Sequence, residues 1–505
     1  MDPVSTPKCQ LWQPSMAWVA RVLAALAIVL TGSIAALAAE APALPEGLGE
    51  SPPSEGPALP EGLGDAPAPS EPALPEGMDS GPELPAGLGD EVDTATTKDQ
   101  ESPDMDLVDR LPPWFHGYWE TRAGVRVQDD PAQSKDLILG ETRVQLELEK
   151  SWDQAILEFT GDVYGDAVLE EGEFDLRQLR LTWRPLDSID IRLGRQILTW
   201  GTGDLLFIND MFPKDWQSFF IGRDTEYLKA PSDAVKVGWY NSFLNVELVY
   251  TPQFAPDRFI TGERISYWDP LFSRYAGSDR QVKYNAPSDW FEDDEFALRL
   301  YRSIGSVEVA LYGYSGYWKS PGGQHFPPLQ ASFPKLNVYG ASVRGNVFKG
   351  IGNVEVGYYD SRQDRSGSSP FINNSEFRLL VGYEQELAKE LTGSIQYYLE
   401  HMMDYESYRN AVFTRVLGEP RDENRHVFTV RLTKLLMNQN LRLSLFAYYS
   451  PSDSDAYLRP HLSYKVNDHW TVEAGGNLFS GAWDQTFFGQ FENNSNVYAG
   501  VRFSF

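Results

Sequence analysis

The chain has 505 residues and is strongly acidic, with 43 Lys and Arg against 72 Asp and Glu and a formal net charge of −29. This acid excess argues against nucleic acid as a partner, because phosphate backbones are bound by basic surfaces. The single cysteine, Cys9, excludes internal disulfides and thiolate metal sites. Aromatic residues make up 13% of the chain although its mean hydropathy is −0.38, a combination that alternating strands permit.

The first 39 residues have the pattern of a secretory signal peptide. Lys8 and Arg21 accompany an almost wholly apolar run at 22–35, and the Ala-Leu-Ala sequence at 36–38 offers a small-residue cleavage site. The apolar run is too short for a spanning helix, and no later stretch reaches the roughly 18 apolar residues that such a helix needs. We therefore expect residues 1–39 to direct export and to be removed.

Residues 40–112 form a separate segment that is rich in Pro, Gly, Glu and Ala. The sequence Pro-Ala-Leu-Pro-Glu-Gly-Leu-Gly occurs there at 42–49 and 57–64, with variants at 72–78 and 82–89. The segment has too few large apolar side chains to offset the entropy lost on folding, so we expect a disordered periplasmic linker. Two interpretations stay open: a plain spacer, or docking motifs at 42–89 for a periplasmic protein.

From residue 113 onward the pattern changes to short alternating runs separated by turn residues, which is typical of β-strands. The expected strands lie at about 114–126, 139–149, 153–164, 174–185, 188–198, 233–240, 243–250, 295–303, 306–315, 336–347, 352–361, 375–386, 390–400, 424–434, 439–449, 456–465, 468–477 and 495–505. Their number is even, as in bacterial outer-membrane barrels. We therefore expect residues 113–505 to form an all-β, transmembrane, antiparallel up-and-down barrel of about 18 strands.

The connections between these strands alternate in length. Every second one is short, around 151–152, 185–186, 241–242, 304–305, 349–350, 388–389, 437–438 and 467–468. The others are mostly longer, above all 199–232, 251–294, 316–335, 401–423 and 478–494. Outer-membrane barrels have short periplasmic turns and long extracellular loops, so this sorting favours a barrel over a soluble sandwich or propeller.

The last expected strand ends the chain on an aromatic residue. Tyr498, Gly500, Phe503 and Phe505 in this strand have a characteristic spacing. They resemble the C-terminal assembly signal of bacterial outer-membrane barrels. The resemblance implies recognition by the barrel assembly machinery and insertion into the outer membrane, in contact with lipid and lipopolysaccharide.

Alternation also predicts which side chains face the lumen, because charged residues on a spanning strand point away from lipid. The predicted pore-lining set is Arg143, Arg180, Arg184, Arg192, Arg299, Arg344, Arg378, Arg431, Arg442, Arg459, Arg502, Glu147, Glu158, Glu355, Glu384 and Glu473. These charges predict either a path for small polar or anionic solutes, or pairs that fill and hydrate the interior. Expected at the membrane interfaces are Trp114, Trp183, Trp200, Trp239, Tyr383 and Trp470.

Residues 192–201 read Arg-Leu-Gly-Arg-Gln-Ile-Leu-Thr-Trp-Gly, and Asp204 and the sequence Asn-Asp-Met-Phe-Pro-Lys-Asp at 209–215 follow. This segment resembles the Gly-Arg-Gln-x-x-x-Trp-Gly motif of an outer-membrane barrel family of unknown function and, more distantly, the alginate-export porins. In such barrels the motif ends a strand at the extracellular rim, and the next loop can fold inward. The resemblance implies that Arg195, Gln196 and Asp204 are candidates for a constriction. Arg195 lies one place off the inward parity set by Arg192, and a bulge at Gly194 would restore it.

Signals for catalysis are weak. The six histidines have no metal-binding spacing, and no nucleophile elbow is present. We expect neither an enzyme nor a bound metal or cofactor. The sequence predicts an outer-membrane porin-like channel, with a structural barrel of an envelope export or electron-conduit complex as the alternative. Because the chain has no Cys-x-x-Cys-His motif, haem in such a conduit would belong to a partner.

Overall fold

The computed structural model describes residue 112 and residues 114–325, 330–411 and 421–505. The chain divides into two units, Met1–Lys98 and Asp99–Phe505, and only the second contains described residues. The expected signal peptide at 1–39 and the repeats at 42–89 lie outside the described residues. No helix in the described ranges is long and apolar enough to cross a membrane.

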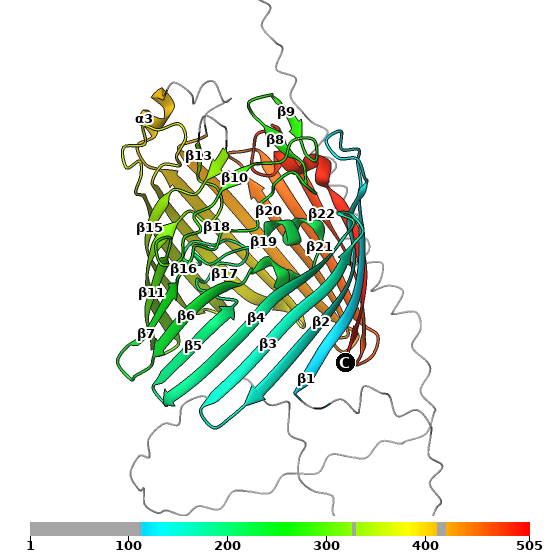
Figure 1. Cartoon of the computed structure of the whole chain (residues 1–505), viewed down its shortest axis with the longest axis vertical. Helices are drawn as coiled ribbons and strands as arrows, with labels where there is room; N and C mark the ends of the chain where they lie inside the picture. Colours follow the sequence, from blue (N-terminus) through cyan, green and yellow to red (C-terminus); the bar gives the residue numbers. More distant parts are fainter. Residues whose placement is uncertain (1–111, 113, 326–329, 412–420) are drawn as a thin grey trace, which may run out of the picture. The chain divides into compact units, whose positions relative to one another are not determined.

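Eighteen antiparallel strands form one closed barrel (Figure 1). In chain order they are β1 (Phe115–Arg126), β2 (Leu137–Ser151), β3 (Ala155–Asp166), β4 (Glu171–Leu186), β5 (Ile189–Gln196), β6 (Ser232–Trp239), β7 (Asn245–Thr251), β11 (Glu295–Ile304), β12 (Val307–Tyr317), β15 (Lys335–Val347), β16 (Gly350–Ser361), β17 (Glu376–Ala388), β18 (Leu391–Met402), β19 (Asn424–Leu436), β20 (Leu441–Ser450), β21 (Asp455–Lys465), β22 (Trp470–Gly481) and β23 (Asn496–Ser504). Each strand pairs with the next, and β23 pairs with β1. The expected all-β up-and-down barrel is confirmed, and each expected strand coincides with one of these elements to within a few residues.

The end of the chain completes the ring of hydrogen bonds. In the β1–β23 pair, Trp119 lies opposite Phe503. Beyond this ladder, the backbone N–H of Phe505 donates to the Gly117 carbonyl at 2.9 Å, and the Gly117 N–H donates back at 3.0 Å. The Phe505 ring stacks on Phe115 with the ring centroids 5.9 Å apart. Closure leaves no unpaired strand edge, which is the condition for a sheet to sit in lipid.

The two faces of the barrel wall differ as alternation predicts. On β2, Val144 is 37% exposed on the outer face, whereas Arg143 and Gln145 on the inner face are each 2% exposed. On β23, Val497 is 45% exposed and Tyr498 is 4% exposed. Exposed apolar side chains on the outside and buried polar ones on the inside are the reverse of a soluble protein. This arrangement fits a wall that faces lipid.

The connections are sorted between the two ends of the barrel. Where β1 begins and β23 ends, the strands are joined by short turns, such as 187–188 between β4 and β5. Long connections lie at the opposite end, the top of Figure 1, and contain β8 (Tyr267–Asp269), β9 (Arg274–Ala276), β10 (Tyr284–Asn285), β13 (Gly323–His325), β14 (Gln330–Ser332), α3 (Tyr405–Asn410) and η3 (Gly489–Asn494). The expected sorting is confirmed, although the connections 167–170 and 451–454 at the long-loop end are short.

The hydrophobic core lies inside the barrel instead of within the wall. Ile208, Phe220 and Ile221 from the connection 197–231 are 0%, 3% and 1% exposed. They belong to one cluster with wall side chains such as Tyr457 and Phe479. The connection 252–294 and the connection before β23 add Ile265, Phe488 and Phe491 to the same cluster. Long connections thus supply the apolar side chains that a second layer supplies in a soluble fold.

Candidate functional site

Residues 197–231, between β5 and β6, fold into the barrel and are named the inward loop. The loop contains α2 (Trp216–Ile221) and η2 (Thr225–Leu228), which Figure 1 draws as green ribbon within the wall. Phe220 of α2 packs against Phe479 of β22 and Tyr457 of β21, with ring centroids 5.2 and 5.8 Å apart. The loop that follows the Gly-Arg-Gln motif therefore folds inward, as the resemblance implies.

Local chemistry determines where α2 begins and ends. Asp215 caps its start, because the carboxylate accepts a hydrogen bond from the Ser218 N–H at 2.7 Å. Gly222 ends it with a left-handed backbone, φ +96°. A Cβ at Gly222 would also lie 2.2 Å from Cδ1 of Tyr498 on β23. Only glycine therefore permits both the turn and the close approach of the loop to the wall.

Glu355 on β16 anchors the first half of the inward loop. Its Oε2 accepts hydrogen bonds from the backbone N–H and the hydroxyl of Thr202, at 2.7 and 2.9 Å. Its Oε1 accepts from the backbone N–H and the side-chain amide of Asn209, at 2.7 and 3.0 Å. The side chain is 1% exposed. A residue expected to line the pore is thus placed under the loop, where its charge is shared among four donors.

Two side chains of the barrel wall, on β18 and β19, hold Asp204. Its carboxylate binds the Arg431 guanidinium of β19 in a bidentate ion pair, with one contact of 2.7 Å between Nη2 and Oδ1. Gln396 of β18 both donates to the Asp204 carbonyl and accepts from its N–H, each at 2.8 Å. The Asp204 and Arg431 side chains remain 34% and 26% exposed. This pair is therefore in part accessible to water, unlike the buried Glu355.

The other wall holds the second half of the inward loop through paired charges. Arg122 of β1 lies between Glu120, at 2.7 Å, and Glu473 of β22. Arg502 of β23 donates to the same Glu120 at 2.9 Å and contacts Asp224 of the loop at 3.3 Å. Both cations therefore have carboxylate partners. For Arg502 and Glu473, this pairing agrees with the interpretation that the inward charges form pairs that fill and hydrate the interior.

A second buried network lies beside the first. Arg223 of the inward loop donates through Nε to Glu141 of β2 at 3.0 Å, and Arg143 donates to the same carboxylate at 3.1 Å. Arg143 also pairs with Asp162 of β3, which accepts the hydroxyl of loop residue Tyr227 at 2.8 Å. Both partners of each pair are nearly buried, so removing one would leave the other charge uncompensated.

Arg195 and Gln196 point to opposite sides of the wall. The β4–β5 register pairs Arg195 with Leu179, which is 46% exposed on the outer face, and contains no shift at Gly194. The expected bulge at Gly194 is therefore wrong, because the glycine has a left-handed φ of +110° but keeps its place in the ladder. Arg195 pairs with Asp233 at 2.9 Å. Gln196 faces inward, is 0% exposed and donates to the Ala234 carbonyl at 2.9 Å.

The predicted pore-lining residues fall into three groups by burial. Buried beneath the loop are Arg143, Arg459, Glu355 and Glu473; half-buried are Arg180, Arg192, Arg299, Arg378, Arg431, Arg502 and Glu158; exposed toward the short-turn end are Arg184, Arg344, Arg442, Glu147 and Glu384. We name the exposed group the vestibule. Within the described residues, Arg344 and Arg442 have no ion pair, whereas Arg180 binds Glu158 at 2.7 Å. Glu147 and Glu384 likewise have no ion pair within the described residues, so the vestibule holds exposed side chains of both signs.

A second loop supports the inward loop from the long-loop end. Asp257, in the connection 252–294, accepts the backbone N–H of Lys214 at 2.8 Å and the indole N–H of Trp216 at 3.2 Å. It also accepts the Ser320 hydroxyl at 2.6 Å. Burial raises the pKa of Asp257, although the hydrogen bond from Ser320 and the charge of Lys214 oppose the rise. The contact between the two loops therefore depends on a carboxylate that is costly to ionise.

Sequence reasoning missed several residues that the site uses. Glu120 and Arg122 alternate inward on β1, so the same period of two that selected Arg143 identifies them. Arg223 and Tyr227 have no such signal, because the path of a loop is not periodic. Trp200 was expected at a membrane interface, but that expectation is wrong: it is 9% exposed and its indole donates to Glu247 at 2.9 Å inside the barrel.

No protein-family model matches the sequence, and no curated protein matches it. Among solved structures, outer-membrane proteins match this chain at low sequence identity. OccAB3 of Acinetobacter baumannii has 9% sequence identity and a TM-score of 0.46, over 77% of this chain and 98% of that one. OccK11 of Pseudomonas aeruginosa has 8% identity and a TM-score of 0.45, over 77% and 95%. A porin of Rhodopseudomonas blastica has 11% identity and a TM-score of 0.34, over 77% and 99%.

Proposed function

We propose that this protein is an outer-membrane porin-like channel for small polar or anionic solutes, narrowed by the inward loop. One observation carries the proposal: a closed barrel with an apolar outer face holds a loop across its interior and keeps charged inward side chains exposed beside it. Rings of charged side chains select ions by sign. We expect Arg344 and Arg442, without carboxylate partners in the described residues, to favour anions, and Glu147 and Glu384 to oppose them in part. In this proposal residues 1–39 direct export, and the segment 40–112 lies in the periplasm.

We leave one of the residues that the sequence predicted for the constriction out of it. The Asp204 and Arg431 side chains are in part accessible to water, and Gln196 lies buried at the start of the inward loop. Arg195 faces outward by register, so we leave it outside the constriction. We also propose that the chain is related to the Gly-Arg-Gln-x-x-x-Trp-Gly barrel family, on the basis of residues 192–204.

Reversal potentials in planar bilayers test the channel and its selectivity together. We expect the purified wild-type protein to conduct, and Arg344→Gln with Arg442→Gln to shift the reversal potential in a KCl gradient toward cation preference. Arg302→Gln is the matched control, because its side chain lies on the outer set of β11 next to Phe243, 5.5 Å from the ring centre. A silent wild-type barrel contradicts the channel. Unchanged selectivity in the double variant contradicts an anion path through the vestibule.

A structural barrel in an envelope export or electron-conduit complex is the second candidate. The extent of anchoring favours it, since the inward loop is bonded to strands on opposite walls, β16 and β19 on one side and β1, β2 and β23 on the other. Planar-bilayer conductance separates the candidates, because an open pore supports the channel and a silent barrel that co-purifies with a periplasmic protein supports the structural role. Deleting residues 40–112 tests the docking motifs. Loss of a co-purifying periplasmic protein supports docking at 42–89, and unchanged partners with unchanged conductance contradict it.

A further inference from the structure

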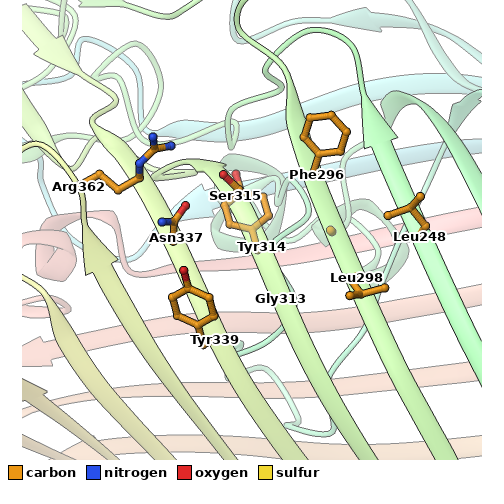
Figure 2. A pocket seen from close by; sticks show the side chains of 10 residues that line it. Leu248, Phe296, Leu298, Gly313, Tyr314, Ser315, Asn337, Tyr339 and Arg362 are labelled. Carbon is orange, nitrogen blue, oxygen red and sulfur yellow. The ribbon is translucent and has the colours of Figure 1, made fainter.

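The outer face of the barrel has a groove over β7, β11, β12 and β15. Its volume is about 390 Å³, within the usual range of ligand pockets of roughly 300–1,000 Å³. Figure 2 shows Gly313 at its centre, with Phe296, Leu248 and Leu298 on one side and Tyr339 on the other. A Cβ at Gly313 would meet no atom within 4 Å. The missing side chain is therefore what opens the groove in an otherwise covered wall.

The apolar walls of this groove are exposed on the outer face of the barrel. Phe296 is 47% exposed, Leu248 44%, Leu298 37% and Tyr339 57%. In a membrane these surfaces face lipid chains, and a flexible hydrocarbon chain can follow an elongated groove between side chains. The lower part of the groove therefore fits the acyl chain of a lipid.

The upper end of the groove is polar and cationic. Arg362 follows β16 directly and lies at the long-loop end, with Asn337 and Ser315 beside it (Figure 2). Its backbone N–H donates to the Lys335 carbonyl at 3.0 Å, but its guanidinium has no hydrogen bond or ion pair within the described residues. An exposed guanidinium with neighbouring amide and hydroxyl groups is suited to a phosphate.

The carboxylates near this end are already bound to other groups. Asp360 pairs with Arg365, with contacts of 2.7 and 2.8 Å, and Asp293 accepts the Tyr317 hydroxyl at 2.8 Å. Lys335 lies nearby with its ammonium 5.9 Å from the Tyr317 ring centre. Arg362 also lies within electrostatic range of Asp360, whose two oxygens are bound by Arg365. Two arginines thus face one carboxylate at this end of the groove, which favours an anionic partner.

We infer that this groove is a specific site for a phosphorylated lipid of the leaflet next to the long loops, the lipid A part of lipopolysaccharide. Arg362 binds the phosphate, and one acyl chain follows the groove past Gly313 toward Leu298. The inference rests on the membrane location in the proposed function. A second copy of the chain fits less well, because a two-fold contact through this face brings Arg362 of both copies together.

Native mass spectrometry of the purified barrel in detergent tests the site, with lipid A, phosphatidylglycerol and phosphatidylcholine added separately. We expect one lipid A per barrel. Arg362→Gln should weaken its binding by about 10- to 150-fold, since the phosphate loses a charge-assisted hydrogen bond. Gly313→Leu should fill the groove and abolish binding. Because the Gly313 site has open space, this variant is expected to fold.

Two variants serve as matched controls and should bind lipid A normally. Gly165→Leu adds the same side chain to open space on β3, away from the groove, and Arg302→Gln removes an outer-face cation near the short-turn end. Equal binding by all five proteins overturns the inference, as does equal binding of phosphatidylglycerol. A dimer that Gly313→Leu dissociates overturns it in favour of a contact between copies. Conductance of the same variants is measured in parallel, so a failed channel and a failed lipid site are distinguished.

Discussion

Replacing Glu355 with glutamine removes the charge that holds the first half of the inward loop. Each carboxylate oxygen accepts two hydrogen bonds from Thr202 or Asn209. A glutamine keeps one oxygen and turns an NH₂ group toward two donors. Hydrogen bonds to a buried charge contribute roughly 1.5–3 kcal/mol each, and rotation of the Thr202 hydroxyl recovers part of the loss. We therefore expect the docked loop to lose about 2–4 kcal/mol, a factor of roughly 30 to 1,000 in its opening equilibrium.

Hydrogen exchange followed by mass spectrometry measures this opening directly. The amides of Thr202 and Asn209 should exchange faster in Glu355→Gln by that factor, while the strand amides of the barrel keep their protection. Glu384→Gln is the matched control, because Glu384 also faces inward, on the neighbouring strand β17, and is exposed in the vestibule. Unchanged exchange at both loop amides in Glu355→Gln would refute the anchoring role.

Three further predictions concern the same loop. Asp204→Asn should increase the flicker of single-channel currents, because its half-exposed ion pair with Arg431 stabilises the docked loop by about 1 kcal/mol. Exchanging the two residues, Asp204→Arg with Arg431→Asp, should restore steady currents. Gly222→Ala should destabilise the docked inward loop by about 2–4 kcal/mol, because alanine is strained in a left-handed backbone and its Cβ overlaps Tyr498. The variant should therefore release the loop at a lower denaturant concentration. As pH falls from 7 toward the ordinary carboxyl pKa of about 4, docking should strengthen, because docked Asp257 has the raised pKa and takes up a proton on docking. Asp257→Asn should remove this dependence of exchange on pH, and a wild-type loop that loosens with acid would contradict it.

The strands of this protein were predictable because their signal is local. A spanning strand must alternate, and the turns between strands show Gly, Asn and Asp, so all eighteen strands were found from the sequence. The inner face of β2 followed from the same rule, and Arg143 and Val144 lie on the faces expected for them. The direction of the inward loop followed only from the resemblance of residues 192–204 to a known motif.

The roles of the inward charges were not predictable in the same way. Glu355, Arg344 and Arg502 each fall on an inward position by the alternation of their own strand. Yet one anchors a loop, one is exposed in the vestibule and one is paired within a network. Parity says which side of the wall a residue occupies, but not whether a loop covers it. Trp200 shows the same limit, because an aromatic at the end of a strand suits either the membrane interface or the interior.

The sequence by itself determined the barrel, the faces of its strands, the end that carries the long loops and the aromatic residue that closes it. Each of these follows from a period of two, or from turn residues close together in the chain. Only the tertiary structure decided that the inward loop crosses the interior, which charges it buries and which it leaves in water, and that Gly313 opens a groove toward lipid beneath Arg362. Those features depend on residues far apart in the chain that meet only when the barrel closes.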